Sequence, residues 1–379
     1  MNITRFSFPT PIHFGPGARK LVAQHLLEAG YRRPLVGTDK ALAALPVLAE
    51  FRSHLAGLDV AVFDGVFGNP TASQVMAGAA AFKAHGADAV IGFGGGAALD
   101  VAKVVGVMAV HEGDVLEYVW DHPRARPIVH ELPYFVALPT TSGTGSEVGR
   151  SSVVSQDDTH VKRVVFSPKI LARAVFADPE LTLALPAAIT AATGMDALTH
   201  NVESYLSPAY HPLCDGIALE GARIAARALA KAVAEPGNIG ARSDMMMASM
   251  MGAIAFQKDL GAVHSCAHAL STVADLHHGL ANGVMIDHVM GFNLPTAVAK
   301  MAELARVCGA PGGAAGSEEA RAASFIVWLR ELKTSIGIPA KLSGIAGARP
   351  ITRADLPRLV EVAYADLCHQ TNPRKCAKS

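Results

Sequence analysis

The sequence contains few charged and few aromatic residues. Charged residues make up 17% of the 379 residues and aromatic residues 6%, whereas 50% are hydrophobic. Basic and acidic residues both number 33, so neither sign is in excess. A balanced charge provides no basic surface for nucleic acid or an anionic membrane. The apolar content can bury large cores. We therefore expect an ordered globular chain with no nucleic-acid or membrane partner.

Cysteines are also few, and long hydrophobic runs are missing. The five cysteines are odd in number, scattered and without CxxC spacing, which favours neither a disulfide framework nor a cysteine-ligated zinc. No apolar run reaches the roughly 20 residues that a membrane helix needs. The opening residues 1–8 alternate like a β-strand instead of following the charged-then-apolar pattern of a secretory signal. These features predict a soluble, cytoplasmic protein.

The periodicity of apolar residues changes near residue 185. Before it, short apolar runs predict strands at 34–38, 60–63, 89–93 and 134–138. Helical patterns lie between them, at 18–28, 41–55, 73–85 and 97–108. Such alternation is typical of a parallel sheet with helices on both faces. After it, long helical patterns cover 187–206, 212–234, 241–258, 260–275 and 320–334. We predict an α/β domain over 1–185 and an all-helical domain over 186–379.

A glycine-rich segment, Gly92-Phe93-Gly94-Gly95-Gly96, joins a predicted strand to a predicted helix. Glycine lets backbone N–H groups approach an anion closely, and a helix N-terminus adds favourable partial charge. The spacing is not the GxGxxG of the Rossmann fingerprint. For this segment alone, a tight turn that binds nothing is therefore an equally good interpretation.

A second loop favours the binding interpretation. Residues 139–147, which follow the strand at 134–138, are rich in glycine and hydroxyl side chains. Open α/β sheets use two such loops at strand carboxyl ends to hold a dinucleotide. Asp39, just after the second strand, fits either of two roles. It can accept from a ribose hydroxyl, which would favour NAD over NADP, or it can cap the next helix.

Histidine and aspartate recur at helical spacing in the second domain. Asp196 and His200 are four residues apart, as are His264 and His268, and His277-His278 follows. Residues at i and i+4 share one helix face, yet either pair alone is most often incidental. Several imidazoles in helices rich in apolar residues need a partner when buried. A divalent cation would satisfy them, and this donor set suits Fe(II) or Zn(II) rather than Mg or Ca.

In combination, these segments resemble the iron-containing (group III) alcohol dehydrogenases, over nearly the whole chain. The shared motifs are Gly94-Gly95-Gly96 with Asp100 and Lys103; Pro139-Thr140-Thr141 with Gly143, Thr144 and Glu147; Asp178-Pro179 with Leu181; Gly194-Met195-Asp196-Ala197 with His200; His264 with His268; His278-Gly279 with Asn282; and Asn372-Pro373-Arg374. One position departs from the pattern, because Ala97 replaces the usual serine after the three glycines and removes a hydroxyl donor.

The resemblance implies a Rossmann-like dinucleotide-binding domain and a helical metal domain, an architecture also found in dehydroquinate synthase. It implies one metal ion, Fe(II) or Zn(II), held by Asp196, His200, His264 and His278. His268 is the implied catalytic residue beside the substrate, passing a proton or else orienting the metal site. The implied cofactor is NAD, contacted by Asn69, Gly95, Gly96, Thr140, Thr141, Thr144 and Lys162. Asp39 after the second strand and Ala97 after the three glycines are further cofactor-binding candidates. The implied substrate pocket contains Ser151, Phe256 and Cys368.

The implied activity is NAD-linked hydride transfer to or from a small primary alcohol, diol or hydroxy acid, in a dimer or larger homo-oligomer. Two alternatives share the architecture. A lyase of the dehydroquinate synthase kind should need several basic residues near the metal for its polyanionic substrate, and the segments around Asp196, His264 and His278 lack them. A glycerol dehydrogenase-like enzyme fits the Asp/His ligand set less well.

Overall fold

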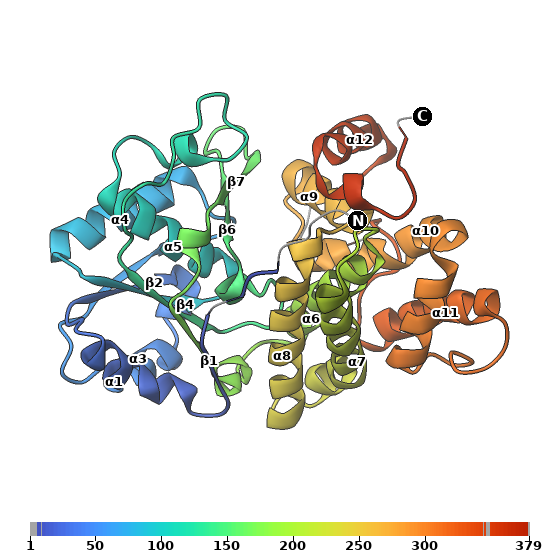
Figure 1. Cartoon of the computed structure of the whole chain (residues 1–379), viewed down its shortest axis with the longest axis horizontal. Coiled ribbons are helices and arrows are strands. Elements are labelled where there is room, and N and C mark those ends of the chain that lie inside the picture. Colours follow the sequence, from blue (N-terminus) through green and yellow to red (C-terminus); the bar gives the residue numbers. More distant parts are fainter. Residues whose placement is uncertain (1–5, 9, 344, 346–348, 378–379) are drawn as a thin grey trace. The chain divides into compact units, whose positions relative to one another are not determined.

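The computed structural model describes residues 6–8, 10–343, 345 and 349–377 (Figure 1). Contacts divide the chain into two compact units. The α/β unit comprises the described residues of Pro9–Thr141 and Ser146–Thr182. The helical unit comprises those of Met1–Phe8, Ser142–Gly145 and Leu183–Ser379. The short segment Ser142–Gly145 thus belongs to the helical unit although the chain on both sides of it lies in the α/β unit.

The α/β unit is built on a six-stranded parallel sheet with the order β1-β8-β5-β4-β2-β3. Its strands are β1 Ile12–Phe14, β2 Pro34–Asp39, β3 Ala61–Val66, β4 Ala89–Gly94, β5 Tyr134–Pro139 and β8 Ala174–Ala177. β4 is buried along its whole length, as its run of apolar residues and glycine predicts for a central parallel strand. The order reverses between β2 and β4, where open α/β sheets bind ligands at the strand carboxyl ends.

Helices cover both faces of this sheet (Figure 1). They are α1 Val22–Glu28, α2 Lys40–Ala43, α3 Pro46–Ser53, α4 Ala72–His85 and α5 Gly96–Val110, with short 3-10 turns η1 Ala18–Leu21, η2 Val115–Tyr118, η3 Ser146–Val148, η4 Pro168–Ile170 and η5 Pro179–Thr182. Leu26 of α1 and Phe51 of α3 enter one core with Ile91 and Phe93 of β4. The Phe51 and Phe93 rings stack with centroids 4.7 Å apart, which anchors α3 to the sheet.

The helical unit contains no strand among the residues that the structure describes. Its helices are α6 Ala187–Leu206, α7 Pro212–Ala234, α8 Ile239–Ala255, α9 Ala262–Ala274, α10 His278–Cys308, α11 Glu318–Ser335 and α12 Leu356–Ala365, with the 3-10 turns η6 Phe256–Lys258, η7 Arg353–Asp355 and η8 Cys368–Thr371. Alanine, leucine and methionine from α6, α7, α8, α10 and α11 form one large core. Within the described residues, no helix is both long enough and apolar enough to cross a membrane.

The predicted fold class is confirmed, and the four predicted strands are present. Four strands were not among those predicted: β1, β8, and the antiparallel pair β6 Ser151–Ser155 and β7 Lys162–Phe166. The predicted strand at 1–8 is wrong for residues 6–8, which form no strand, and residues 1–5 lie outside the described residues. The first strand is β1.

Helix prediction erred where glycine and proline obscure the pattern. The predicted helix 41–55 is two helices, because Pro46 begins α3 at a position where proline is well tolerated. α10, the longest helix, was not predicted. It contains Gly279, Gly283, Gly291 and Pro295, which are poor helix formers, and its backbone leaves helical geometry at Ala297. Packing against α11 and α6 stabilises it despite these residues.

Candidate metal centre

Three helices of the helical unit bring the predicted metal ligands together. Asp196 and His200 occupy successive turns of α6, which is buried along most of its length. His264 lies in the first turn of α9, and His278 is the first residue of α10. The three imidazoles face one carboxylate oxygen, Asp196 Oδ1. The Nε2 atoms of the three imidazoles lie from Asp196 Oδ1 at 3.9 Å (His200), 3.7 Å (His264) and 3.4 Å (His278).

These separations fit a shared divalent cation. Ligand atoms bound at about 2.0–2.1 Å in a tetrahedron are about 3.3–3.4 Å apart. The ligand atoms of Asp196, His200 and His264 all lie within 4.8 Å of one another, and these side chains are nearly fully buried. Distances of 3.7 and 3.9 Å are too long for hydrogen bonds, so the imidazoles converge on the carboxylate without being bonded to it. The donor set therefore fits Fe(II) or Zn(II).

The electrostatics of Asp196 and His200 match the same role. Burial alone would raise the pKa of the Asp196 carboxyl, but the neighbouring imidazoles hold it well below its usual range. Burial lowers the pKa of His200 to about 4, aided by the charge of His264, so that its ring is neutral near pH 7. A carboxylate and neutral imidazole are the forms that ligate a metal. Burial alone would lower the pKa of His264, but the carboxylates of Asp196 and Glu203 raise it to about 9, so a metal has to displace a proton there.

Glu203 orients His264. It lies on α6 one turn beyond His200, and its side chain is 2% exposed. Its Oε2 atom is 2.6 Å from His264 Nδ1, which leaves Nε2 directed at Asp196. The same carboxylate accepts from the backbone N–H of Val263 at 2.7 Å and caps the start of α9. Gly261 permits this approach, because a Cβ there would lie 2.6 Å from Glu203 Oε1. Carboxylate–histidine pairs of this kind fix the tautomer of metal ligands.

Asn282 borders the position between the ligands. It is fully buried and lies one turn after His278 on α10. Its Nδ2 group donates to Asp196 Oδ1 at 2.7 Å and lies 3.4 Å from His264 Nε2 and 3.2 Å from His278 Nε2. Asn282 thus contacts three of the four candidate ligands.

His268 does not join this cluster through its Nδ1 atom. That atom lies 2.8 Å from Oδ2 of Asp366, the residue that ends α12. The His268 ring stacks on His278, with centroids 5.2 Å apart and an interplanar angle of 18°. His268 is therefore adjacent to a candidate ligand and is oriented by a carboxylate of its own.

The residues proposed for the substrate pocket fall in both units. Phe256 packs against His200 with ring centroids 5.2 Å apart, and Cys368 lies beside His268 and Asp366. Ser151 begins β6 in the α/β unit, where its carbonyl oxygen accepts from Lys103. Two of the three pocket candidates thus lie close to metal-centre residues.

The two predicted nucleotide loops meet at adjacent strands of the α/β unit. Gly94 at the end of β4 pairs with Pro139 at the end of β5, and Thr140 N–H donates to Gly94 O at 3.0 Å. Gly94 has φ 155°, and a Cβ there would lie 2.6 Å from the Ala98 Cβ, so only glycine fits. Gly95 is the N-cap of α5 and faces Thr141, while Gly96 and Ala97 open the helix. Free backbone donors of the first helical turn are thus grouped at one sheet edge.

The remaining nucleotide candidates take different positions. Asp39 accepts from Leu42 N–H at 2.8 Å and is the N-cap of α2, which is one of its two predicted roles. Lys162 pairs with Ser155 across β6 and β7, and Ser155 N–H donates to Pro70 O, next to Asn69. Thr144 lies in the segment assigned to the helical unit, whose neighbour Gly143 accepts from Ser249 Oγ at 3.0 Å.

A buried polar network supports the second loop from within the α/β unit. Lys103 on α5 is buried and donates to Ser146 Oγ and Ser151 O, both at 2.8 Å. Asp100 accepts from Ser146 Oγ at 2.6 Å and from Val153 N–H at 2.9 Å. Burial raises the pKa of Glu147, next to Ser146, to about 7. These motif residues therefore tie α5 to the loop and to β6.

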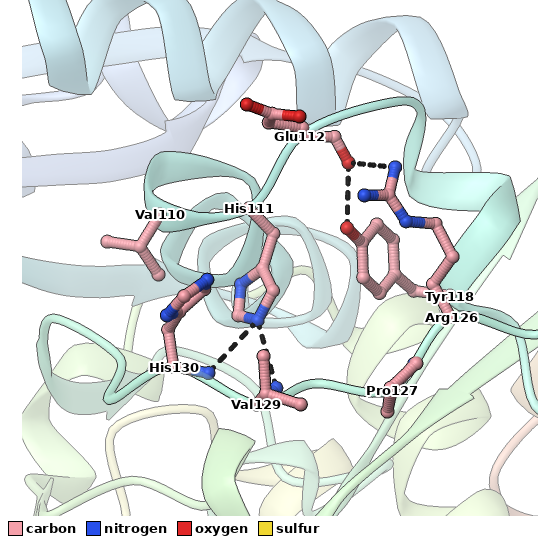
Figure 2. Close-up of a pocket in the computed structure, with 8 residues that line it drawn as sticks. All are labelled: Val110, His111, Glu112, Tyr118, Arg126, Pro127, Val129 and His130. Carbon is pink, nitrogen blue, oxygen red and sulfur yellow. Dashed lines mark hydrogen bonds between the residues drawn. The ribbon is translucent and has the colours of Figure 1, made fainter.

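A pocket of about 310 Å³ lies at the opposite end of α5 from the glycine loop (Figure 2). His111 lines it, but both ring nitrogens have partners. Nδ1 donates to Val107 O at 3.0 Å, and Nε2 accepts from the N–H groups of Val129 and His130 at 3.1 and 3.3 Å. His111 is thus a structural histidine that closes the loop after α5.

Sequence reasoning missed three residues of the metal region. Glu203 follows Asp196 and His200 at i+7, so the helical stripe that marked the first two also contains it. Asn282 was noted only as a motif residue. Asp366 had no signal in the sequence, because its partner His268 is 98 residues away.

Comparisons with known proteins identify the family. The family model described as iron-containing alcohol dehydrogenase matches residues 9–179. The model of the Fe-containing alcohol dehydrogenase family C-terminal domain matches residues 190–379. Together they cover most of the chain. The chain therefore belongs to the iron-containing alcohol dehydrogenase family, as the sequence motifs predict.

Individual relatives match along nearly their full length. The chain is 37% identical to 4-hydroxybutyrate dehydrogenase of Cupriavidus necator over 97% of this chain and 95% of that protein. It is 34% identical to NAD-dependent methanol dehydrogenase of Bacillus methanolicus over 98% of this chain and 96% of that protein. The crystal structure of a 1,3-propanediol oxidoreductase superposes with a TM-score of 0.93 at 36% identity, covering 99% of this chain and 97% of that one. The chain is accordingly an alcohol oxidoreductase.

Proposed function

We propose that the protein is a metal-dependent, NAD-linked dehydrogenase of small primary alcohols, diols or hydroxy acids, which also reduces the corresponding aldehydes. The observation that carries the proposal is the convergence of His200, His264 and His278 on one buried carboxylate oxygen of Asp196. The names of the relatives support it, since they act on a hydroxy acid, methanol and a diol, and one is NAD-dependent.

In this proposal, residues 186–379 hold the metal. A bound divalent cation supplies Lewis acidity toward the hydroxyl or carbonyl oxygen of the substrate. The four ligands fix that cation, and Glu203 keeps His264 in the tautomer that binds it. His268 accepts and releases the hydroxyl proton, while Asp366 holds its Nδ1 side. Phe256 and Cys368 are the substrate-pocket candidates of this unit, and Ser151 is the candidate of the α/β unit.

In the same proposal, residues 1–185 bind NAD. Gly95, Gly96 and Ala97 present the start of α5 to the pyrophosphate. Thr140, Thr141 and Thr144 add donors from the second loop, and Asn69 and Lys162 complete the nucleotide contacts. Asp39 favours NAD over NADP, since a carboxylate repels a 2′-phosphate. The cofactor itself supplies the hydride chemistry.

The lyase alternative is less well supported. Residues 187–206 and 260–287, which contain all four candidate ligands, include no lysine or arginine. A phosphorylated, polyanionic substrate would need such residues near the metal. A glycerol dehydrogenase-like activity differs only in the alcohol and is separated by the substrate screen below. We further propose a cytoplasmic homo-oligomer, which light scattering of the purified protein would test.

The decisive experiment is anaerobic reconstitution with Fe(II) or Zn(II), followed by a screen of NAD reduction over short alcohols, diols and hydroxy acids. We expect turnover of at least one class, dependent on metal and faster with NAD than with NADP. His264→Ala should lose both metal and turnover. His268→Ala should keep the metal and lose roughly 10²-fold or more in rate. Metal-independent turnover, or full activity of His268→Ala, would contradict the respective assignments.

A further inference from the structure

A second group of metal-ligating side chains lies next to the first. His268 comes from α9, Asp366 ends α12, and Cys368 begins η8. One ligand atom from each lies within 4.8 Å of the other two. We propose that these three residues form a second cation site, for a sulfur-binding divalent ion such as Zn²⁺ or Cd²⁺, separate from the site of Asp196.

The contact between His268 and Asp366 is the starting point. His268 Nδ1 and Asp366 Oδ2 are 2.8 Å apart, so a proton lies between two atoms that are otherwise both lone-pair donors. A metal ion can replace that proton. Two ligands bound at about 2.0–2.1 Å in a tetrahedron are about 3.3–3.4 Å apart, so the pair needs to open by only about half an ångström. Two protons are released to solvent as the ion binds, the one shared by His268 and Asp366 and the one on the Cys368 thiol.

The other oxygen of Asp366 holds the carboxylate in place. Its Oδ1 atom accepts from Ser265 Oγ at 2.7 Å and from Cys368 N–H at 2.9 Å. Ser265 Oγ in turn accepts from His369 N–H at 2.8 Å. These bonds tie α9 to the segment after α12 and leave Oδ2 directed at His268. Outer hydrogen bonds of this kind are typical of built metal sites.

Accessibility and donor type define the ion. The side chains of His268 and Asp366 are 25% and 21% exposed, against 1% and 3% for His264 and Asp196, so solvent cations can reach the pair. Nitrogen, oxygen and sulfur together suit Zn²⁺ or Cd²⁺ and not Mg²⁺ or Ca²⁺. Three protein ligands leave a fourth position for water. The Asp196 site contains no sulfur, which distinguishes the two sites chemically.

Occupancy of the second site has a consequence for turnover, which rests on the proposed function. His268 stacks on the candidate ligand His278 and is the proposed proton carrier. An ion bound to His268 Nδ1 prevents His268 from carrying the substrate proton. Because two neighbouring dications repel each other, the second site binds more weakly than the first. Excess Zn²⁺ therefore inhibits the metal-loaded enzyme.

Cd²⁺ titration tests the site directly. The full-length protein, loaded with one equivalent of Zn²⁺, is titrated with Cd²⁺ while the ultraviolet thiolate-to-Cd²⁺ charge-transfer band is followed. Exchange at the Asp196 site gives no such band, because that site lacks a thiolate. We expect one saturable band with one Cd²⁺ per chain. Cys368→Ser should remove it, and Asp366→Asn should weaken Cd²⁺ binding roughly tenfold or more.

Matched variants keep the test decisive. Cys266 lies on α9 and is also partly exposed, so Cys266→Ser is the control and should retain the band. His268→Asn leaves every cysteine in place and should weaken binding like Asp366→Asn, even if Cys368→Ser folds poorly. A missing band in the wild type, or a band that survives Cys368→Ser and disappears in Cys266→Ser, would overturn the site.

Inhibition is measured separately, as the ratio of rates with and without excess Zn²⁺ for each protein. The wild type should be inhibited and Cys368→Ser should not. If the wild type bound Cd²⁺ but was not inhibited by excess Zn²⁺, the proposal that an ion at the second site slows turnover would be wrong. If the wild type showed the Cd²⁺ band but no dehydrogenase activity at all, the proposed function would be wrong, whereas the second cation site would still be supported.

Discussion

The two units use different parts of the chain for binding. In the helical unit, the proposed metal centre consists of side chains from α6, α9 and α10, and Glu203 and Asn282 contact three of its four ligands. In the α/β unit, the glycine loop of the proposed nucleotide site offers backbone groups, and a Cβ on Gly94 would clash with the Ala98 side chain. Deleting a side chain should therefore damage the first site, whereas adding one should damage the second.

The largest expected effect comes from deleting a ligand. His278→Ala should reduce bound metal to background and lower the turnover rate by roughly 10³-fold or more, because a cation with three ligands loses both affinity and placement. The neighbouring His277→Ala is the control. His277 caps α10 by accepting from Leu280 N–H at 3.4 Å, so its loss should cost only about 1 kcal/mol of stability.

Metal analysis by mass spectrometry and NADH formation measure both variants. If His277→Ala lost the metal and His278→Ala kept it, the fourth ligand would be His277. The distance of 3.4 Å between His278 Nε2 and Asp196 Oδ1 would then not reflect metal binding.

Glu203→Gln probes the support of a ligand. The amide keeps the shape of the side chain but loses the charge opposite His264 Nδ1, which lies 2.6 Å away. We expect roughly 10- to 100-fold weaker metal binding with unchanged NAD affinity. Competition with a chromophoric chelator gives the metal affinity, and nitrogen NMR of the histidines reports the His264 tautomer. An unchanged metal affinity would show that Glu203 serves only to cap α9.

Gly94→Ala tests the opposite expectation, that adding one carbon disrupts the backbone site. The new Cβ would lie 2.6 Å from Ala98 Cβ at a φ of 155°, so the loop must move. NAD binding should weaken roughly tenfold, measured by fluorescence or calorimetry, while metal content stays the same. Gly216→Ala adds the same carbon where nothing lies within 4 Å and should change neither. If Gly94→Ala lost metal as well as NAD affinity, the two sites would not respond independently to substitutions.

The smallest expected effect is a pH dependence confined to the α/β unit. Burial raises the pKa of Glu147 from 4.5 to about 7, so the folded chain keeps a proton that the unfolded chain has released. The contribution of Glu147 to stability is therefore fully present below pH 4.5 and is lost as the pH rises through about 7. The full effect is about 3 kcal/mol at most. Glu147→Gln should lessen this fall, measured by urea unfolding from pH 5 to pH 8. If the stability of the wild type and of Glu147→Gln changed with pH in the same way, Glu147 would not be the source of the pH dependence.

The two units also differed in how well they could be predicted. The central strands of the α/β unit were found because each is a short apolar run between glycine-rich turns. The hairpin β6–β7 was not, since Ser151–Ser155 and Lys162–Phe166 mix serine and basic residues with valine. In the helical unit, α6 was predicted from 187 to 206, as observed, whereas the glycine-rich α10 was not predicted. Tertiary packing, not local propensity, stabilises α10.

The sequence alone determined the family, the fold class and the identity of the candidate ligands, because helical spacing and motif residues are properties of neighbouring positions. It could not show that Glu203 bonds to His264, that Asn282 lies between the ligands, or that Asp366 and Cys368 reach His268. Apart from the contact of Asn282 with His278, which lies 4 positions away, those contacts join residues 18 to 100 positions apart, for example 61 for Glu203 and His264. Only the packing of α6, α9, α10 and α12 brings them within reach, since side-chain contacts between helices depend on how the chain folds back and not on local spacing.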